Sequence, residues 1–253
     1  MYDYCGTPPS PPSSHIRLGA RFSRAAFLAA LVYTAPSLSH CVSYPPSPAA
    51  SIRHNTHLRF IDLKGNSLQD SSLSELATAL KDNRKFRALD LSHNKITGAG
   101  CANLVQLVNR SLQFLNISYN PIGDAGAQKL AGGISNTTNL RELNIAECKI
   151  GDYGATFLAT ALAVNKSLQT IIMNGNNIGG EQASKRIAFA LMRNQNLKVL
   201  KMGGNGLREG IEHFARLVET TKSLTSLDLS ANGISDAGAL SLGNALTMNR
   251  SIR

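Results

Sequence analysis

One pattern of leucines organises the sequence and returns about every 28 residues from Leu58 onward. Residues 224–234 match L-x-x-L-x-L-x-x-N-x-L at every fixed position. Successive copies are separated by 28, 26, 28, 28, 29 and 27 residues, and they begin at Leu58, Phe86, Leu112, Leu140, Leu168, Leu197 and Leu224. A repeat of this length predicts an elongated fold in which each unit packs mainly against its two neighbours.

The first half of each repeat has the alternation of a short β-strand. In the third repeat we expect Leu115 and Ile117 to point inward. Phe114, Asn116 and Ser118 should then face away from the core. A polar position follows each strand, and its side chain should bond backbone groups that no sheet ladder reaches. The residues at this position are Asn66, Asn94, Asn120, Cys148, Asn176, Asn205 and Asn232.

The second half of each repeat predicts an amphipathic helix, because apolar residues recur at i, i+3, i+4 and i+7. The fourth repeat shows this stripe in Ala155, Leu158, Ala159 and Leu162, and the last repeat shows it in Ala239, Leu242, Gly243 and Leu246. Acidic residues precede three of the helical segments and are predicted to be helix N-caps. These residues are Asp124, Asp152 and Asp236.

Neither half of a repeat can bury its apolar face alone, so the units must be stabilised by stacking. We therefore predict an α/β solenoid in the shape of a horseshoe. A parallel β-sheet would form its concave face and α-helices its convex face. The repeat domain would span residues 57–253, with seven repeats and the start of an eighth at Ile252.

The repeats resemble those of the ribonuclease-inhibitor-like subfamily of leucine-rich repeat proteins. The match is carried by the pattern L-x-L/I-x-x-N/C-x-I-x-D-x-G-A in residues 115–127, 143–155 and 227–239, and by Asn165-Lys-Ser-Leu at a helix exit. Relatives of this type include the sensor regions of NOD-like receptors, the Ran GTPase-activating protein and ribonuclease inhibitor. The resemblance implies the solenoid fold and a protein partner.

Residues 1–56 have a different composition, rich in proline, serine and arginine. Proline clusters flank an apolar stretch at residues 25–33, which is too short to span a bilayer, so no transmembrane span is predicted. Three interpretations of the segment stay open: the core of a signal peptide, part of a transit peptide, or a disordered tail.

The chain is basic, with 26 Lys and Arg against 16 Asp and Glu. Residues 1–56 hold four of the basic residues and one of the acidic ones, which leaves 22 against 15, or +7, for the repeats. Such an excess favours acidic partners. Nucleic-acid binding is not indicated, because no basic run is interleaved with aromatic residues.

The four cysteines favour a reducing compartment, because none forms a Cys-x-x-Cys pair and Cys101 and Cys148 fall at predicted core positions. We therefore expect a cytoplasmic protein. An organelle or secretion is the alternative if residues 1–56 are a targeting peptide.

No residue pattern indicates catalysis. The glycines near Gly175 lack the Lys-Ser/Thr of a phosphate loop, and His54 and His57 lack further metal ligands. No nucleophile, base and orienting residue stand out together. We expect no catalytic residue, metal, cofactor or small-molecule substrate, and so no enzyme.

The concave face is the candidate site, because several of its exposed positions hold apolar or arginine side chains, which often dominate binding energy. The predicted partner-binding residues are Phe60, Arg87, Phe114, Tyr119, Arg141, Glu142, Ile172, Val199 and Lys201. We expect a non-enzymatic scaffold that binds a protein in the concave groove. The resemblance implies an alternative, a GTPase-activating or regulatory protein for a Ran-like small GTPase.

Overall fold

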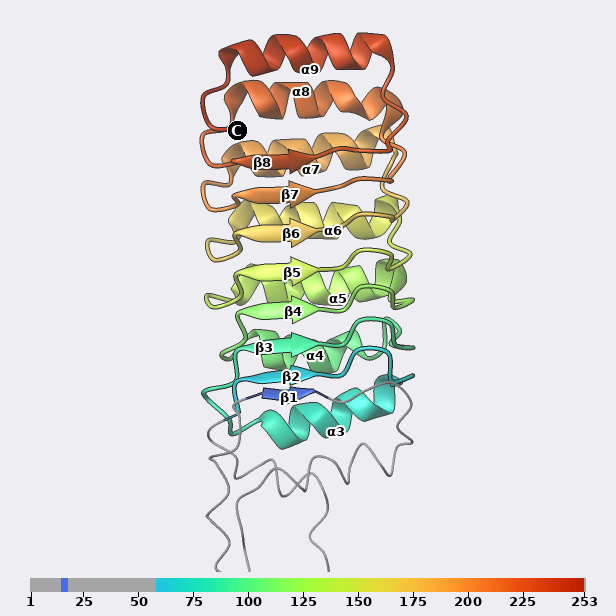
Figure 1. The fold of residues 1–253 in the computed structure, drawn as a ribbon, viewed down its shortest axis with the longest axis vertical. Helices are drawn as coiled ribbons and strands as arrows, with labels where there is room; N and C mark the ends of the chain where they lie inside the picture. Colours follow the sequence, from blue (N-terminus) through green and yellow to red (C-terminus); the bar gives the residue numbers. More distant parts are fainter. Residues whose placement is uncertain (1–14, 18–57, 253) are drawn as a thin grey trace, which may run out of the picture.

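The structure is a computed structural model that describes residues 15–17 and 58–252. Its strands form one parallel sheet in the order in which they occur along the chain, and a helix follows each strand from β2 onward (Figure 1). The strands are β1 (His15–Arg17), β2 (Phe60–Asp62), β3 (Ala88–Asp90), β4 (Phe114–Asn116), β5 (Glu142–Asn144), β6 (Thr170–Ile172), β7 (Val199–Lys201) and β8 (Ser226–Asp228). The helices are α3 (Asp70–Leu80), α4 (Cys101–Val108), α5 (Gly123–Asn136), α6 (Asp152–Val164), α7 (Glu181–Arg193), α8 (Ile211–Thr220, after the 3-10 turn Arg208–Gly210) and α9 (Asp236–Met248).

The predicted solenoid is confirmed. Figure 1 shows the strands as one layer with the helices in a second layer behind them. Equivalent residues pair across the sheet, so that Phe114 of β4 lies opposite Ala88 of β3 and Glu142 of β5. The repeat pattern did not predict β1, which comes from the segment 1–56 and pairs in parallel with β2.

The core lies between the two layers and consists of the residues predicted to point inward. Leu115, Ile117, Leu158 and Leu162 are all fully buried. Ser118 is an exception to the expected alternation, because it is buried rather than facing away from the core. Its hydroxyl donates to Asn116 Oδ1 over 2.8 Å, which holds the side chain against the end of the strand.

The amide ladder is confirmed and joins each repeat to the one before it. Asn94 Oδ1 accepts the backbone N–H groups of Asn66 and Leu68 at 2.9 Å, and Asn94 Nδ2 donates to the carbonyl oxygen of Leu63 at 2.9 Å. These bonds satisfy backbone groups that would otherwise be buried without a partner. The ladder is therefore structural.

Cys148 stands at the same position as these asparagines. Its thiol donates to the carbonyl oxygen of Ile117, with 3.3 Å between sulfur and oxygen. Burial raises the pKa of the Cys148 thiol to about 12, and it does the same for Cys101, the other buried thiol in the described part of the chain. Both thiols therefore stay protonated at neutral pH and act as small core residues.

The predicted N-cap role of Asp124, Asp152 and Asp236 is wrong. Asp124 Oδ1 accepts the backbone N–H of Gly151 at 2.6 Å, and Asp152 Oδ1 accepts that of Gly180 at 2.9 Å, so both carboxylates bond the following repeat. At α9, Ser235 takes the N-cap position, and its side chain accepts the N–H of Gly238. Asp124 and Asp152 therefore connect repeats rather than capping their own helices.

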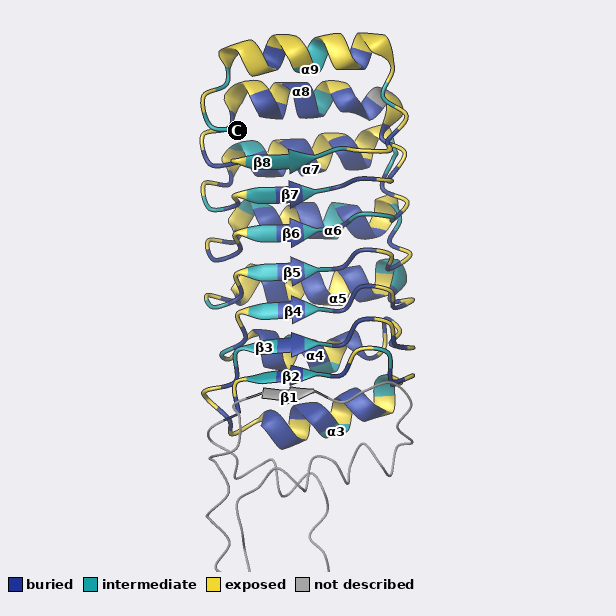
Figure 2. Ribbon diagram, viewed as in Figure 1, coloured by how far each residue is buried: buried dark blue, intermediate teal, exposed yellow. Residues whose placement is uncertain are grey.

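The apolar stripe predicted for the last repeat is not buried. Ala239, Gly243 and Leu246 of α9 are exposed, Leu242 is half-buried, and Figure 2 shows α9 as mostly exposed where the other helices are blue toward the core. Within residues 58–252, no repeat packs against this side of α9. The same spacing therefore gives a buried stripe only where a following unit covers it.

A second ladder of buried polar side chains lies where each helix ends. Asn165 Nδ2 donates to the carbonyl oxygen of Ile134 at 2.6 Å, and Asn165 Oδ1 accepts the N–H groups of Ser167 and Leu168. Asn194 makes the equivalent bonds one repeat later. Asn165 begins the Asn165-Lys-Ser-Leu sequence at this helix exit, and these hydrogen bonds explain why asparagine stands there.

No helix among the described residues is both long and apolar enough to cross a membrane. The described residues also hold no group of three or more His, Cys, Asp and Glu side chains that could bind a metal. His54, His57 and the apolar stretch 25–33 lie outside the described residues.

Candidate functional site

The sheet brings together six of the nine residues predicted to contact a partner. Phe60, Phe114, Glu142 and Val199 occupy the first position of their strands and lie in one row across the sheet. Ile172 and Lys201 pair with each other in the third-position row. All six are half-buried, because neighbouring side chains in the same row cover part of each.

The two predicted arginines lie at an edge of the sheet rather than on its open face. Arg141 Nη1 donates to the carbonyl oxygen of Ser167 at 2.8 Å. Arg87 Nη1 lies 2.7 Å from the carbonyl oxygen of Arg84 and 3.4 Å from that of Ser111. These guanidinium groups already hold adjacent repeats together, so only Arg141, which is still exposed, offers much surface to a partner.

Tyr119 lies on the rim where the strands end, and it is half exposed. Its ring stacks on that of His93, with 4.1 Å between centroids and 10° between planes. Both residues have a left-handed backbone, with φ of 57° for Tyr119 and 56° for His93. Bulky residues rarely adopt this conformation, and here the N–H of Tyr119 is fixed by the carbonyl oxygen of Ala146 in the next repeat.

Sequence reasoning missed His93 and Glu147, which continue this rim on either side of Tyr119. Glu147 also has a positive φ, and its side chain lies over Gly175, where an added Cβ would overlap it. The sequence does carry a signal, because glycine stands directly before the ladder position in three repeats. The residue at this position has a left-handed backbone in all seven repeats, and these residues are Gly65, His93, Tyr119, Glu147, Gly175, Gly204 and Ala231. The bulky side chains among them are therefore presented in one line.

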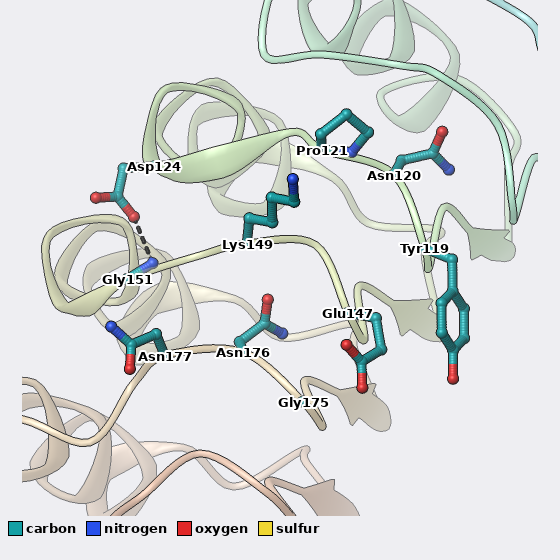
Figure 3. A pocket seen from close by; sticks show the side chains of 10 residues that line it. All are labelled: Tyr119, Asn120, Pro121, Asp124, Glu147, Lys149, Gly151, Gly175, Asn176 and Asn177. Atoms are coloured by element: carbon teal, nitrogen blue, oxygen red, sulfur yellow. Dashed lines mark hydrogen bonds between the residues drawn. The ribbon is translucent and has the colours of Figure 1, made fainter.

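An open pocket of about 640 Å³ lies behind this rim. Tyr119 and Glu147 lie at one end of the pocket and Asp124 at the other, with Lys149 between them (Figure 3). Asp124 is engaged with the backbone of Gly151. The pocket is open, which suits contact with a protein surface better than enclosure of a small ligand.

The third-position row of the sheet carries a polar network at each end. Asn116 Nδ2 donates to Asp90 Oδ2 at 3.0 Å. At the other end, Asp228 accepts from the backbone N–H of Ser230, and this bond, with those from the Ser230 hydroxyl and Asn174, holds the pKa of Asp228 below its usual range. The Asp228 carboxylate is therefore charged at neutral pH, and Asp90 and Asp228 place acidic side chains toward the two ends of the open face.

Basic residues gather on the opposite edge from the rim. In Figure 1 the loops that leave each helix and enter the next strand all lie along the left side, and we call this the helix-exit edge. From residue 81 onward, these loops hold ten basic residues and one acidic residue, Asp82. The basic residues are Lys81, Arg84, Lys85, Arg87, Arg110, Arg141, Lys166, Lys198, Lys222 and Arg250. The excess of charge is thus concentrated on one side.

Comparisons with known proteins agree with this repeat architecture. A family model for the Leucine Rich repeat matches residues 54–77, 82–105, 108–131, 136–159 and 222–243. Among solved structures, the tropomodulin C-terminal domain of Caenorhabditis elegans has a TM-score of 0.48 and 16% identity, covering 60% of this chain and 92% of that one.

Two relatives identify the type of repeat. NACHT, LRR and PYD domains-containing protein 9 of Bos taurus is 31% identical over 205 residues, which is 78% of this chain and 20% of that protein. Ribonuclease inhibitor of Sus scrofa is 28% identical over 199 residues, which is 76% of this chain and 43% of that protein. The chain spans less than half the length of either relative. It belongs to the leucine-rich repeat proteins, and its repeats are of the ribonuclease-inhibitor-like type.

Proposed function

We propose that the chain is a protein-interaction scaffold that binds a protein partner on the open, concave face of its sheet. The partner would contact the first-position row around Phe114 and the rim at Tyr119. The alternative, regulation of a Ran-like small GTPase, stays a prediction that only a hydrolysis assay with such a GTPase can test.

The stacked pair of His93 and Tyr119 carries this proposal. A left-handed backbone at a non-glycine residue costs on the order of 1 kcal/mol. The fold holds three such residues side by side at His93, Tyr119 and Glu147. Hydrogen bonds from their N–H groups to the next repeat hold this backbone in place, so that two rings and a carboxylate side chain stand at the rim without being buried. Aromatic side chains held in one conformation lose little entropy on binding, which makes them efficient contacts.

The first-position row supports the same surface. Phe114 lies next to Glu142 in this row, and Val199 lies further along it, so the row places apolar side chains on both sides of one carboxylate. Because these side chains are half-buried, a partner can complete their burial at little further cost in side-chain entropy. Aromatic anchors surrounded by polar groups are typical of the centre of a protein interface.

The test compares one double variant with a matched control. Phe114→Ala with Tyr119→Ala removes both aromatic contacts, and we expect it to abolish specific capture of a partner from a lysate of the source cells. Tyr153→Ala is the control, because Tyr153 is an exposed tyrosine on the convex side in α6. Mass spectrometry of the captured proteins and thermal melts of both variants give the result.

Retained capture by a folded Phe114→Ala and Tyr119→Ala variant would contradict the proposal. Equal loss of capture in the Tyr153→Ala control would also contradict it, because the effect would then not depend on the concave face.

A further inference from the structure

A groove between α6 and α7 opens onto the helix-exit edge. Two connected hollows of about 530 and 800 Å³ share Ala163, Val164 and Arg193 and run along the two helices to their carboxyl ends. Small residues such as Ala159 and Ala190 line the floor where the helices face each other. We call this the α6–α7 groove. It lies on the other layer of the solenoid from the sheet and is a separate surface.

The groove is lined by four cations and by no carboxylate. Lys166, Lys185, Arg186 and Arg193 are all exposed, and no ion pair joins any of them to an acidic residue within residues 58–252. Two apolar side chains lie among them, Val164 at 57% exposure and Phe189 at 45%. The groove thus combines a strong positive charge with an exposed apolar strip.

Helix geometry alone does not explain these cations. Basic residues are favoured in the last turn of a helix, because they compensate the partial negative charge there, and Arg193 is such a residue. Lys185 and Arg186 lie in the first half of α7, where compensation of the helix dipole does not favour a positive charge. The helix dipole therefore does not account for Lys185 and Arg186.

The groove between α8 and α9, further along the same layer of helices, shows that the charge is not a general property of these helices. It is smaller, at about 350 Å³, and it is lined by Glu212 and Glu219 with Arg216 as its one basic residue. Glu212 is already engaged, since its Oε1 accepts the hydroxyl of Ser241 at 2.9 Å. Grooves built in the same way thus differ in sign of charge, and the difference lies in the side chains.

We propose that the α6–α7 groove binds an acidic amphipathic helix of a partner protein. Its carboxylates would pair with Lys166, Lys185, Arg186 and Arg193, and its apolar residues would cover Val164 and Phe189. A helix fits because its side-chain ridges pack into the groove between two others. An amphipathic helix also presents the apolar and the charged groups that this surface complements.

The apolar strip favours a peptide over a nucleic acid. A phosphate backbone would satisfy the cations but would leave Val164 and Phe189 with no apolar partner. Sequence-independent binding of single strands uses several aromatic residues in succession as stacking platforms, and Phe189 is the one aromatic residue that lines this groove. Duplex DNA and an anionic membrane are therefore the competing outcomes of the test.

The probe is a fluorescein-labelled helical peptide with glutamates on one face and leucines on the other, titrated with the full chain and followed by fluorescence anisotropy. We expect saturable binding that weakens as salt is added. Lys185→Glu with Arg193→Glu should raise the Kd of the peptide about tenfold, because each exposed charge contact contributes little and the variant reverses two of them. Phe189→Ser should raise the Kd as well.

The matched control is Lys64→Glu with Lys95→Glu, which changes the net charge equally at two exposed positions on the opposite edge. It should leave the Kd unchanged, as should Phe114→Ala with Tyr119→Ala, which separates this proposal from the function proposed for the concave face. Thermal melts check that every variant is folded.

Three results would overturn the proposal. In the first, the peptide does not bind in a saturable way. In the second, Lys64→Glu with Lys95→Glu weakens peptide binding as much as Lys185→Glu with Arg193→Glu does, which would mean that binding depends on net charge alone. In the third, duplex DNA or phosphatidylserine vesicles bind with the same dependence on Lys185 and Arg193 while the peptide does not, and the ligand is then a different polyanion.

Discussion

The helices α6 and α9 have nearly the same pattern of residues but differ in what covers them. In α6, Ala155, Leu158 and Leu162 are fully buried between neighbouring repeats. In α9, the equivalent stripe is exposed or half-buried, and only Gly238 and Ala245, which face α8, are buried. Burial in this fold is therefore a property of a pair of neighbouring repeats, as expected for a solenoid whose stability is a sum of unit and interface terms.

The largest expected difference between the two helices concerns their leucines. Leu162→Ala should lower the free energy of unfolding by about 2–5 kcal/mol, because it leaves a cavity in a closed core. The equivalent change in α9, Leu246→Ala, should cost less than about 1 kcal/mol, because Leu246 is 48% exposed. Urea unfolding followed by circular dichroism measures both. Equal losses would mean that the outer side of α9 is covered in solution.

A smaller difference is expected along the amide ladder. Asn94→Ala should cost about 1–3 kcal/mol, because it leaves the buried N–H groups of Asn66 and Leu68 without their acceptor. Asn66→Ala should cost less, because Asn66 Oδ1 has no hydrogen-bond partner among the described residues. The same urea titration separates the two variants. A larger loss for Asn66→Ala would show that a preceding unit bonds it.

The smallest expected effects concern two helical glycines and have opposite signs. At Gly154 of α6, an added Cβ would lie 2.6 Å from Asp124 Oδ1 and 2.9 Å from Asp124 Cα, so Gly154→Ala should destabilise the fold by about 1 kcal/mol. At Gly243 of α9, nothing lies within 4 Å, so Gly243→Ala should stabilise it by about 0.5–1 kcal/mol through helix propensity. Midpoints that shift in the same direction would contradict this assignment of the two surfaces.

The candidate sites follow the same division between a single repeat and a pair. The repeat pattern predicted correctly that Phe114 and Val199 lie on the open face of the sheet, because strand alternation within one repeat fixes the face on which a residue lies. It named Tyr119 as a contact residue but missed its stack with His93, since the two rings come from adjacent repeats. It also assigned Asp124 and Asp152 to their own helices, although both bond the next repeat.

The fold follows from the amino-acid sequence, because a repeated period of leucines specifies which side of every unit is apolar, and stacking is the one arrangement that buries it. The basic charge of the repeats can also be read from the sequence. The place where that charge gathers depends on how the repeats pack. Lys166 belongs to one repeat and Lys185, Arg186 and Arg193 to the next, and they line one groove because α6 and α7 pack side by side. Contacts between units depend on how two neighbouring surfaces meet, and no pattern within one unit contains that information.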